Sequence, residues 1–207
     1  MDIRITVANV KKVFNRRVVF QDISISLSSG QSLLITGRNG SGKSTLAKII
    51  SGILSPSSGS VTLHQQSRIV TNYLRNFVGF VAPYVQMYDE FSARENLRFA
   101  LAIRGLPPDE QIIDLLLSKV SIRERADDRV ATFSSGMKQR LKYAFALVHN
   151  PGIIILDEPM TNLDSEGIQM SRDIMEEHRR EGILIVATND LQDIDRYDVQ
   201  VDLNAPH

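Results

Sequence analysis

The sequence predicts an α/β fold, in which a core of parallel strands and helices carries an N-terminal antiparallel β lobe and an inserted α-helical lobe. Three observations favour this fold: a β-rich beginning, helical periodicity from about 92 to 150, and a strand–helix–strand pattern after it. With 207 residues, 43% of them hydrophobic, the chain can bury one sizeable core. We expect a single domain over residues 1–207, with the helical lobe inserted at about 84–150.

The first third of the chain favours strands. The stretch "IRITVANV" alternates in polarity, and "SLLIT" is a continuous apolar run that suits a buried strand. The stretch "DISISL" places three apolar residues on one face: Ile23, Ile25 and Leu27. A turn at Pro56 and Gly59 then leads into another short strand.

The remaining elements follow from a change of period. Three stretches have apolar residues at helical spacing: "ARENLRFALAIRG", "DEQIIDLLLSKV" and "GMKQRLKYAFALVH". An apolar strand "GIIILD" comes next, then a helix from about 165 to 180 that ends before Gly182. A second apolar strand "ILIVAT" and a short strand near 197–203 complete the pattern.

Composition limits the classes of function. Lys and Arg together number 24, as do Asp and Glu, so no overall field draws the protein to nucleic acid or to an acidic membrane. The absence of Cys excludes disulfides and thiolate metal sites, and is compatible with a reducing compartment. The longest apolar runs are far shorter than the roughly 20 residues that span a bilayer. We expect a soluble protein without a signal peptide, without direct lipid insertion and without a nucleic-acid partner.

A glycine-rich stretch predicts a phosphate-binding loop. "GRNGSGKST" matches G-x-x-x-x-G-K-[ST] and lies between an apolar strand and a helical run. Its residues are candidate nucleotide ligands: Gly37, Arg38, Asn39, Gly40, Ser41, Gly42, Lys43, Ser44 and Thr45. The glycines let successive amides face a phosphate, Lys43 reaches the β- and γ-oxygens, and Ser44 binds Mg²⁺. A flexible turn without a ligand is the alternative.

The strand "IIILDE" ends in two carboxylates. In a phosphate-loop protein, Asp157 at the strand end belongs in the Mg²⁺ shell, and Glu158 can face the γ-phosphate. Phosphoryl transfer passes through a loose transition state, so Glu158 need only orient and polarise the attacking water. A strand capped by solvated acids is the alternative. We predict Glu158 and Lys43 as catalytic residues.

A third stretch, "FSSGMKQRLKYAFAL", begins a helix with small residues. Ser134, Ser135 and Gly136 leave backbone amides bare, and Lys138 and Arg140 follow, a pattern that suits an anion. No loop that could hold a phosphate lies next to it in the sequence. An N-capped amphipathic helix would explain the apolar residues of this stretch, but not its cluster of small ones.

The order of phosphate loop, "FSSGM", "ILDEP" and "TNLD" resembles that of the ATP-binding cassette (ABC) ATPases, over essentially the whole chain. The usual signature of that family is Leu-Ser-Gly-Gly-Gln, whose place is taken here by Phe133, Ser134, Ser135, Gly136 and Met137. The resemblance implies a head-to-tail dimer, in which residues 134–137 of one subunit face the γ-phosphate of ATP held by the other. The helix start would then be half of a binding site.

The resemblance implies further roles. Phe14 occupies the position of an aromatic residue that contacts adenine, with a core Phe as the alternative. Asn162 and Asp164, in "TNLD", would communicate across the dimer, with Asp164 close to the nucleotide. Residues 78–97, here called the joining segment, would connect the core to the helical lobe, respond to nucleotide and meet a membrane partner. Its aromatic residues, such as Tyr84 and Tyr88, suit a docking surface, with core filling as the alternative.

The chain departs from the family pattern at two positions. The joining-segment Gln that usually bonds Mg²⁺ and water is Pro83, which has no side-chain oxygen to offer, and Gln86 is a possible substitute. The switch His is Asn189, which can donate to a phosphate oxygen but carries no proton charge. We predict Asn189 as a catalytic residue of a slow ATPase. The four histidines, His64, His149, His178 and His207, lack ligand spacing and are expected to be structural or solvated.

These features predict the ATP- and Mg²⁺-dependent subunit of an ABC transporter. Its partners would be a second ABC ATPase subunit, as a homo- or heterodimer, and separately encoded integral membrane transporter subunits. The expected location is cytoplasmic, peripheral on the inner (plasma) membrane through those partners. The short length and "ENLRFALAIRGL" resemble the heme-exporter ATPases of cytochrome c maturation. A non-transport ATPase of iron–sulfur cluster assembly is the alternative, and no residue indicates the cargo.

Overall fold

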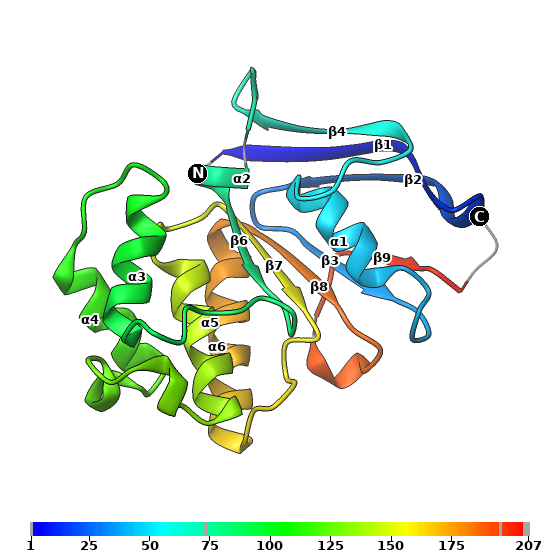
Figure 1. The fold of residues 1–207 in the computed structure, drawn as a ribbon. Coiled ribbons are helices and arrows are strands. Elements are labelled where there is room, and N and C mark those ends of the chain that lie inside the picture. The colour runs from blue at the N-terminus through cyan, green and yellow to red at the C-terminus, as the bar shows by residue number, and fades with distance from the viewer. Residues whose placement is uncertain (1, 73, 195, 205–207) are drawn as a thin grey trace.

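Two β-sheets organise the chain in the computed structural model, which describes residues 2–72, 74–194 and 196–204 (Figure 1). One sheet has the strand order β2-β1-β4-β5 and is antiparallel. The other has the order β6-β7-β8-β3-β9, with every pair parallel. The predicted fold class, with a β lobe, a parallel α/β core and a helical lobe, is confirmed.

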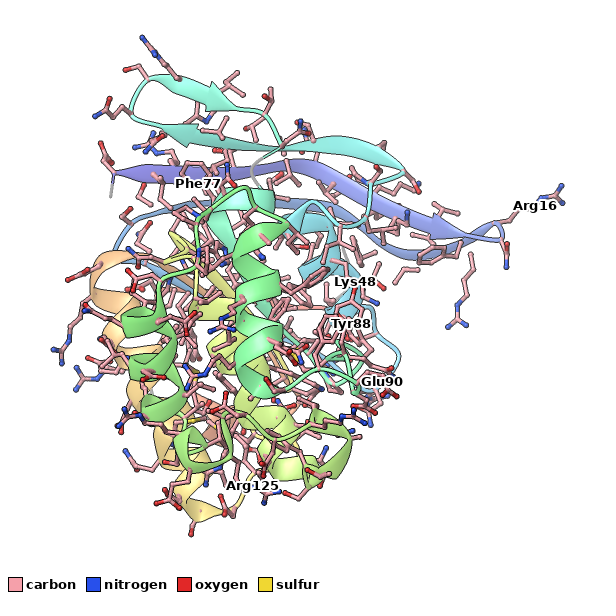
Figure 2. The ribbon with its side chains drawn as sticks, turned by 60° about the vertical axis from the view of Figure 1, so that its left-hand side comes forward. Arg16, Lys48, Phe77, Tyr88, Glu90 and Arg125 are labelled. Atoms are coloured by element: carbon pink, nitrogen blue, oxygen red, sulfur yellow. The ribbon has the colours of Figure 1, made fainter. Side chains whose placement is uncertain are left out.

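The antiparallel sheet contains β1 (Ile3–Phe14), β2 (Arg17–Ser28), β4 (Ser58–Gln65) and β5 (Arg68–Val70). The face predicted for residues 22–27 is confirmed, because Ile23, Ile25 and Leu27 are all buried. The alternating stretch "IRITVANV" ends at Val10, but β1 continues to Phe14, which pairs with Arg17 of β2. Asn15 and Arg16 connect the two strands and both have positive φ, as tight hairpin turns require. Arg16 projects from the tip of this hairpin (Figure 2).

The parallel sheet contains β3 (Ser32–Thr36), β6 (Val78–Val81), β7 (Ile153–Asp157), β8 (Ile183–Ala187) and β9 (Val199–Asp202). Every residue of β3, β7 and β8 is buried, which matches their uninterrupted apolar sequences. In a parallel sheet, the carboxyl ends of the strands meet at one edge. The segments that follow β3, β7 and β8 therefore emerge together.

Helices cover both faces of the parallel sheet. They are α1 (Lys43–Ser51), α2 (Leu74–Phe77), α3 (Ala93–Ala102), α4 (Glu110–Lys119), α5 (Ser135–Leu147) and α6 (Ser165–Glu181), with 3₁₀ turns at Arg123–Arg125, Val130–Thr132 and Leu191–Asp193. Leu33 and Ile35 of β3 face a core shared with α1 and the antiparallel sheet. Leu34 faces a second core that contains residues of α3, α4, α5 and α6. Thus α1 and α5 lie on opposite faces of the parallel sheet (Figure 1).

The helical lobe is inserted in the sequence between β6 and β7, which are themselves neighbours in the parallel sheet. α3 begins with a capping box, in which Ser92 accepts from the Glu95 amide and Glu95 accepts from the Ser92 amide. Asp109 caps the start of α4, because its side chain accepts from the amides of residues 111 and 112. Arg94 binds Asp114 of α4 at 2.6 Å, which ties α3 to α4. α5 also packs directly on β6, so it connects this lobe to the core.

The described histidines have structural positions. His149 is buried and its Nε2 lies 3.2 Å from the Val78 carbonyl oxygen. Burial lowers the pKa of His149 and of His178 to about 4 each, so both are neutral at pH 7. His64 is part of β4, and His207 lies outside the described residues. None of the helices in the described part of the chain combines the length and apolar character needed to cross a bilayer.

Candidate active site

The glycine-rich loop lies between β3 and α1, and three of its residues have backbone conformations that favour glycine. Gly37, Gly40 and Gly42 have φ of 151°, 82° and 108°. A Cβ on Gly37 would lie 2.3 Å from Ser41 Oγ, and one on Gly42 would lie 2.5 Å from Val19 Cγ1. The loop therefore needs glycine both for its backbone conformation and for its close packing.

Lys43, the first residue of α1, brings a positive charge into the loop. Its side chain is 6% exposed, and its Nζ donates to the Gly37 carbonyl oxygen at 2.9 Å. The same Nζ lies 3.6 Å from Glu158 Oε1. The structure thus brings together two of the predicted catalytic residues, which are 115 positions apart (158 minus 43).

The other loop residues surround the start of α1. Arg38 and Asn39 are exposed, and the Arg38 amide donates to Asn204 Oδ1 at 2.9 Å. The buried Ser41 hydroxyl has no hydrogen-bond partner among the described residues. No side chain caps the start of α1, and Ser44 and Thr45 lie in its first turn with no acidic residue. Uncapped amides at a helix N-terminus next to a lysine suit a phosphate.

Two carboxylates lie at the end of β7: Asp157 is its last residue and Glu158 comes next. Asp157 is 1% exposed, and neither of its oxygens has a hydrogen-bond partner of normal geometry among the described residues. Glu158 has a φ of 50°, and its amide donates to the Ala187 carbonyl oxygen at 2.8 Å, which turns its side chain toward Lys43. Burial raises the pKa of Glu158, the positive charge of Lys43 opposes the rise, and Asp157 adds to it.

The Asp157 carboxylate, which lacks a hydrogen-bond partner among the described residues, indicates whether the site fits a metal ion. Burying an ionised carboxylate without a donor or cation is costly, so its oxygens are short of a positive partner. Hard divalent cations such as Mg²⁺ prefer carboxylate and hydroxyl oxygens. Asp157 and Ser44, both at the edge where the phosphate loop begins, are donors of this kind. The residues present therefore fit Mg²⁺.

Asn189 lies beside the loop. It follows β8, and its Nδ2 donates to Asn39 Oδ1 at 3.4 Å. The turn that carries it is fixed by the buried Thr188, which donates to Asp193 and accepts from the Asp190 amide at 3.0 Å. The structure thus brings the residue predicted as a switch into contact with the phosphate loop.

The start of α5 is accessible to solvent. Ser134 caps the helix by accepting from the Met137 amide at 3.2 Å, and both Ser134 and Ser135 are exposed. A Cβ on Gly136 would lie 3.2 Å from the Asn162 carbonyl oxygen, so a small residue allows the two loops to approach. α5 and α1 cover opposite faces of the parallel sheet, and among the described residues no hydrogen bond or ion pair joins Ser134 or Ser135 to the phosphate loop.

Comparison with known proteins assigns the arrangement to a family. The family model described as ABC transporter matches residues 20–161. The chain belongs to the ABC transporter family. It is similar to the lantibiotic transport ATP-binding protein SrtF of Streptococcus pyogenes, at 33% identity over 183 residues, 88% of this chain and 78% of the relative. It is also similar to Nod factor export ATP-binding protein I of Rhizobium leguminosarum bv. viciae, at 36% identity over 168 residues, 78% of this chain and 53% of the relative.

Solved structures agree with this assignment. The structure of an ATP-binding subunit of an ABC transporter has a TM-score of 0.82 at 26% identity, and the match covers 93% of this chain and 82% of that one. The ATP-binding cassette MJ0796, as a dimer in a post-hydrolysis state with ADP and Pi, has the same fold, with a TM-score of 0.77 over 91% of this chain and 89% of that one. The chain is an ABC ATPase that binds ATP.

Asp164, predicted from the ABC pattern to lie close to the nucleotide, has contacts within its own chain. Its Oδ1 accepts from the Gly167 amide at 2.9 Å, which caps α6, and from Arg140 Nη2 at 2.7 Å. Both hydrogen bonds lower the pKa of Asp164, and the bond from the Gly167 amide has the larger effect. Arg140 is nearly buried, so the pair connects α5 to the start of α6. The sequence predicted Arg140 as part of an anion-binding pattern and did not indicate its pairing with Asp164, although Asp before a helical run is a common cap.

Phe14 is not a core residue, so the alternative considered for it is wrong. Its side chain is 46% exposed, and Lys12 Nζ lies 4.8 Å from the ring centroid. Its contact with adenine stays a prediction.

The aromatic residues of the joining segment separate into two groups. Tyr88 packs against Phe91 and Phe99, with ring centroids 5.4 and 4.9 Å away, at the edge of the helical lobe. Tyr84 instead lies against Lys48 of α1, whose Nζ is 3.8 Å from the ring centroid. Pro83 is held by its carbonyl oxygen, which accepts from Lys142 at 3.0 Å, and Gln86 is exposed.

The loop geometry predicts different effects for two matched glycine substitutions. Gly40→Ala adds a Cβ that meets no atom within 4 Å, so its cost is the left-handed backbone alone, about 1–2 kcal/mol. Gly42→Ala adds the same strain and a clash with Val19 and Phe20. We expect Gly42→Ala to lose more than tenfold in ATP affinity and Gly40→Ala clearly less, measured by isothermal titration calorimetry. Equal losses would contradict the packing argument.

Proposed function

We propose that the chain is the ATP-hydrolysing subunit of an export transporter, and that two subunits close head to tail on two molecules of ATP with Mg²⁺. One observation carries this proposal: the serine-rich start of α5 is exposed, and among the described residues no hydrogen bond or ion pair joins Ser134 or Ser135 to the phosphate loop of the same chain. A second subunit, rotated to face the first, would complete both sites at once. The ABC relatives named above support the role in transport.

The residues of one subunit have complementary tasks in this reaction. The amides of the loop and Lys43 bind the phosphates and counter their charge. Ser44 and Asp157 would hold Mg²⁺, which would supply positive charge to counter the charge that develops on the phosphates. Glu158 orients the attacking water, and its raised pKa makes it a better proton acceptor than a solvated carboxylate. Ser134, Ser135 and the amides up to Met137 complete the γ-phosphate site of the facing subunit.

The names of the relatives favour export. They refer to lantibiotic transport and Nod factor export, and another similar protein is the linearmycin resistance ATP-binding protein LnrL of Bacillus subtilis. None of these three is named for heme export or for iron–sulfur cluster assembly. We therefore propose an exporter and do not extend the proposal to either of those two systems.

A surface groove supports attachment to a membrane partner. It has a volume of about 340 Å³ and lies between the end of α1, β6, the joining segment, α3 and α5, lined mainly by apolar residues: Ile53, Phe80, Val85, Ile103 and Phe145. Ile53 and Ile103 are each about half exposed. We propose that a short apolar segment of a transmembrane subunit binds here, which would hold the protein at the cytoplasmic face of the plasma membrane.

Dimerisation tests the central proposal. Glu158→Gln removes the carboxylate that activates water but keeps its shape, so ATP is retained and the closed dimer should accumulate. With ATP and Mg²⁺, this variant should elute as a dimer in size-exclusion chromatography, and as a monomer with ADP. Adding Ser135→Arg, which places a bulky side chain at the start of α5, should abolish the dimer while ATP binding remains. A monomer at saturating ATP would overturn the head-to-tail arrangement.

The role of Asn189 predicts a gain of activity. A hydrogen bond from a charged donor is worth about 1.5–3 kcal/mol, so an uncharged Asn slows turnover roughly tenfold to a hundredfold. Asn189→His should therefore raise the steady-state ATPase rate, and Asn189→Ala should lower it. An unchanged or lower rate for the His variant would refute this role.

The groove predicts a selective loss of assembly. Ile103→Glu places a charge in the apolar lining, and should reduce co-purification of the membrane subunits with a tagged chain by more than tenfold. Leu115→Glu is the matched control, because Leu115 is 67% exposed on α4 and is not part of the lining. ATP binding should persist in both variants. Full assembly of the Ile103 variant would rule out this docking site.

A further inference from the structure

Tyr143 lies in the second half of α5, in the core that this helix shares with the parallel sheet. Its side chain is 1% exposed. Its hydroxyl donates to the Pro159 carbonyl oxygen at 3.0 Å and lies 2.6 Å from Ser171 Oγ of α6. A phenol has a single hydrogen to donate, so with that hydrogen directed at Pro159, Ser171 is the donor in the second bond.

Pro159 directly follows Glu158 in the chain. Its carbonyl oxygen also accepts from Gln139 Nε2, at the longer distance of 3.5 Å. Gln139 and Tyr143 are one turn apart on the same side of α5, and both are buried. Two side chains of α5 therefore converge on one backbone atom beside the active site.

The backbone of Glu158 needs support from its surroundings. Its φ of 50° lies in the left-handed region, which is unfavourable for a residue with a Cβ, and the proline after it restricts it further. Strained backbone persists only where neighbouring contacts fix it. On the side toward β8, the Glu158 amide donates to the Ala187 carbonyl oxygen at 2.8 Å. On the other side, the bond from Tyr143 fixes the next residue.

The proline ring transmits this contact to Glu158. Because the ring fixes the φ of Pro159 at about −65°, holding its carbonyl group also restricts the peptide bond between residues 158 and 159. The Glu158 side chain is then held in the direction seen here, with Oε1 at 3.6 Å from Lys43 Nζ.

We propose that Tyr143 is a positioning residue for Glu158: through the Pro159 carbonyl oxygen, its hydroxyl holds the carboxylate where the attacking water binds. The proposal rests on the proposed function, in which Glu158 orients that water. Since the hydroxyl bonds lie within the core, their loss should lower kcat and leave the KM for ATP unchanged. A misplacement of about 1 Å can lower a rate about a hundredfold, so the loss of one support among several should cost roughly tenfold.

Tyr143→Phe removes the hydroxyl and keeps the ring. We expect a roughly tenfold lower kcat for ATP hydrolysis with Mg²⁺, at an unchanged KM. Ser171→Ala is the matched control, because it removes a buried hydroxyl from the same network but leaves the bond from Tyr143 to Pro159. Both variants should lose thermal stability, and only Tyr143→Phe should lose kcat. Equal losses of kcat in the two variants would assign the network to stability alone.

A double-mutant cycle with Glu158→Gln tests whether Tyr143 acts through the carboxylate. Adding Tyr143→Phe to Glu158→Gln should not slow single-turnover hydrolysis further, because the group that Tyr143 positions is already absent. A further tenfold loss in the Glu158→Gln background would overturn the proposal. Circular dichroism verifies folding. If Tyr143→Phe does not fold, Gln139→Met replaces it, with a smaller loss of kcat and the same dependence on Glu158.

The same measurements distinguish this proposal from the proposed function. If Glu158→Gln hydrolyses ATP as fast as the unmodified protein, the role of Glu158 is refuted, and the positioning role of Tyr143 with it. If Glu158→Gln is slow while Tyr143→Phe keeps full kcat, the proposed function stands and Tyr143 does not position Glu158.

Discussion

The active site depends on the parallel register of β3, β7 and β8. Because these strands point the same way and are buried on both faces, the segments that follow them emerge at one edge of the sheet. Backbone hydrogen bonds extend the register beyond the strands, from the Glu158 amide to the Ala187 carbonyl oxygen and from the Thr188 amide to the Ile35 carbonyl oxygen. The 3.6 Å approach of Lys43 to Glu158 follows from this alignment.

The groups at the carboxyl edge of the parallel sheet lower the stability of the fold. Lys43 is nearly buried, Asp157 is buried without a regular hydrogen bond, and the glycines of the loop hold left-handed backbone conformations. Such features destabilise a fold unless a ligand compensates for them, and they concentrate at functional sites. Bound ATP, together with the divalent cation proposed above, would supply the missing charges, so ligand binding should stabilise the folded state. In the proposed dimer, the exposed start of α5 would supply the other half of the facing subunit's site.

The two departures from the ABC pattern have different structural consequences. Asn189 remains beside the loop, in contact with Asn39, and loses only the charge that a histidine could carry. Pro83 offers no polar side chain, and the structure places the neighbouring Tyr84 against Lys48.

Local patterns in the sequence predicted most of the strands and helices, the phosphate loop and the acidic end of β7, because periodicity and short motifs act between near neighbours. The short elements β5, α2 and β6 were not predicted. Contacts between distant residues could not be obtained in this way. The partnership of Arg140 with Asp164, the exposure of Phe14 and the different neighbours of Tyr84 and Tyr88 were decided by tertiary packing. The sequence by itself determined the family motifs, and from them predicted which groups carry the chemistry. Only the tertiary structure decided which of them meet, because residues far apart in the chain come together through the parallel sheet and the two cores on its faces.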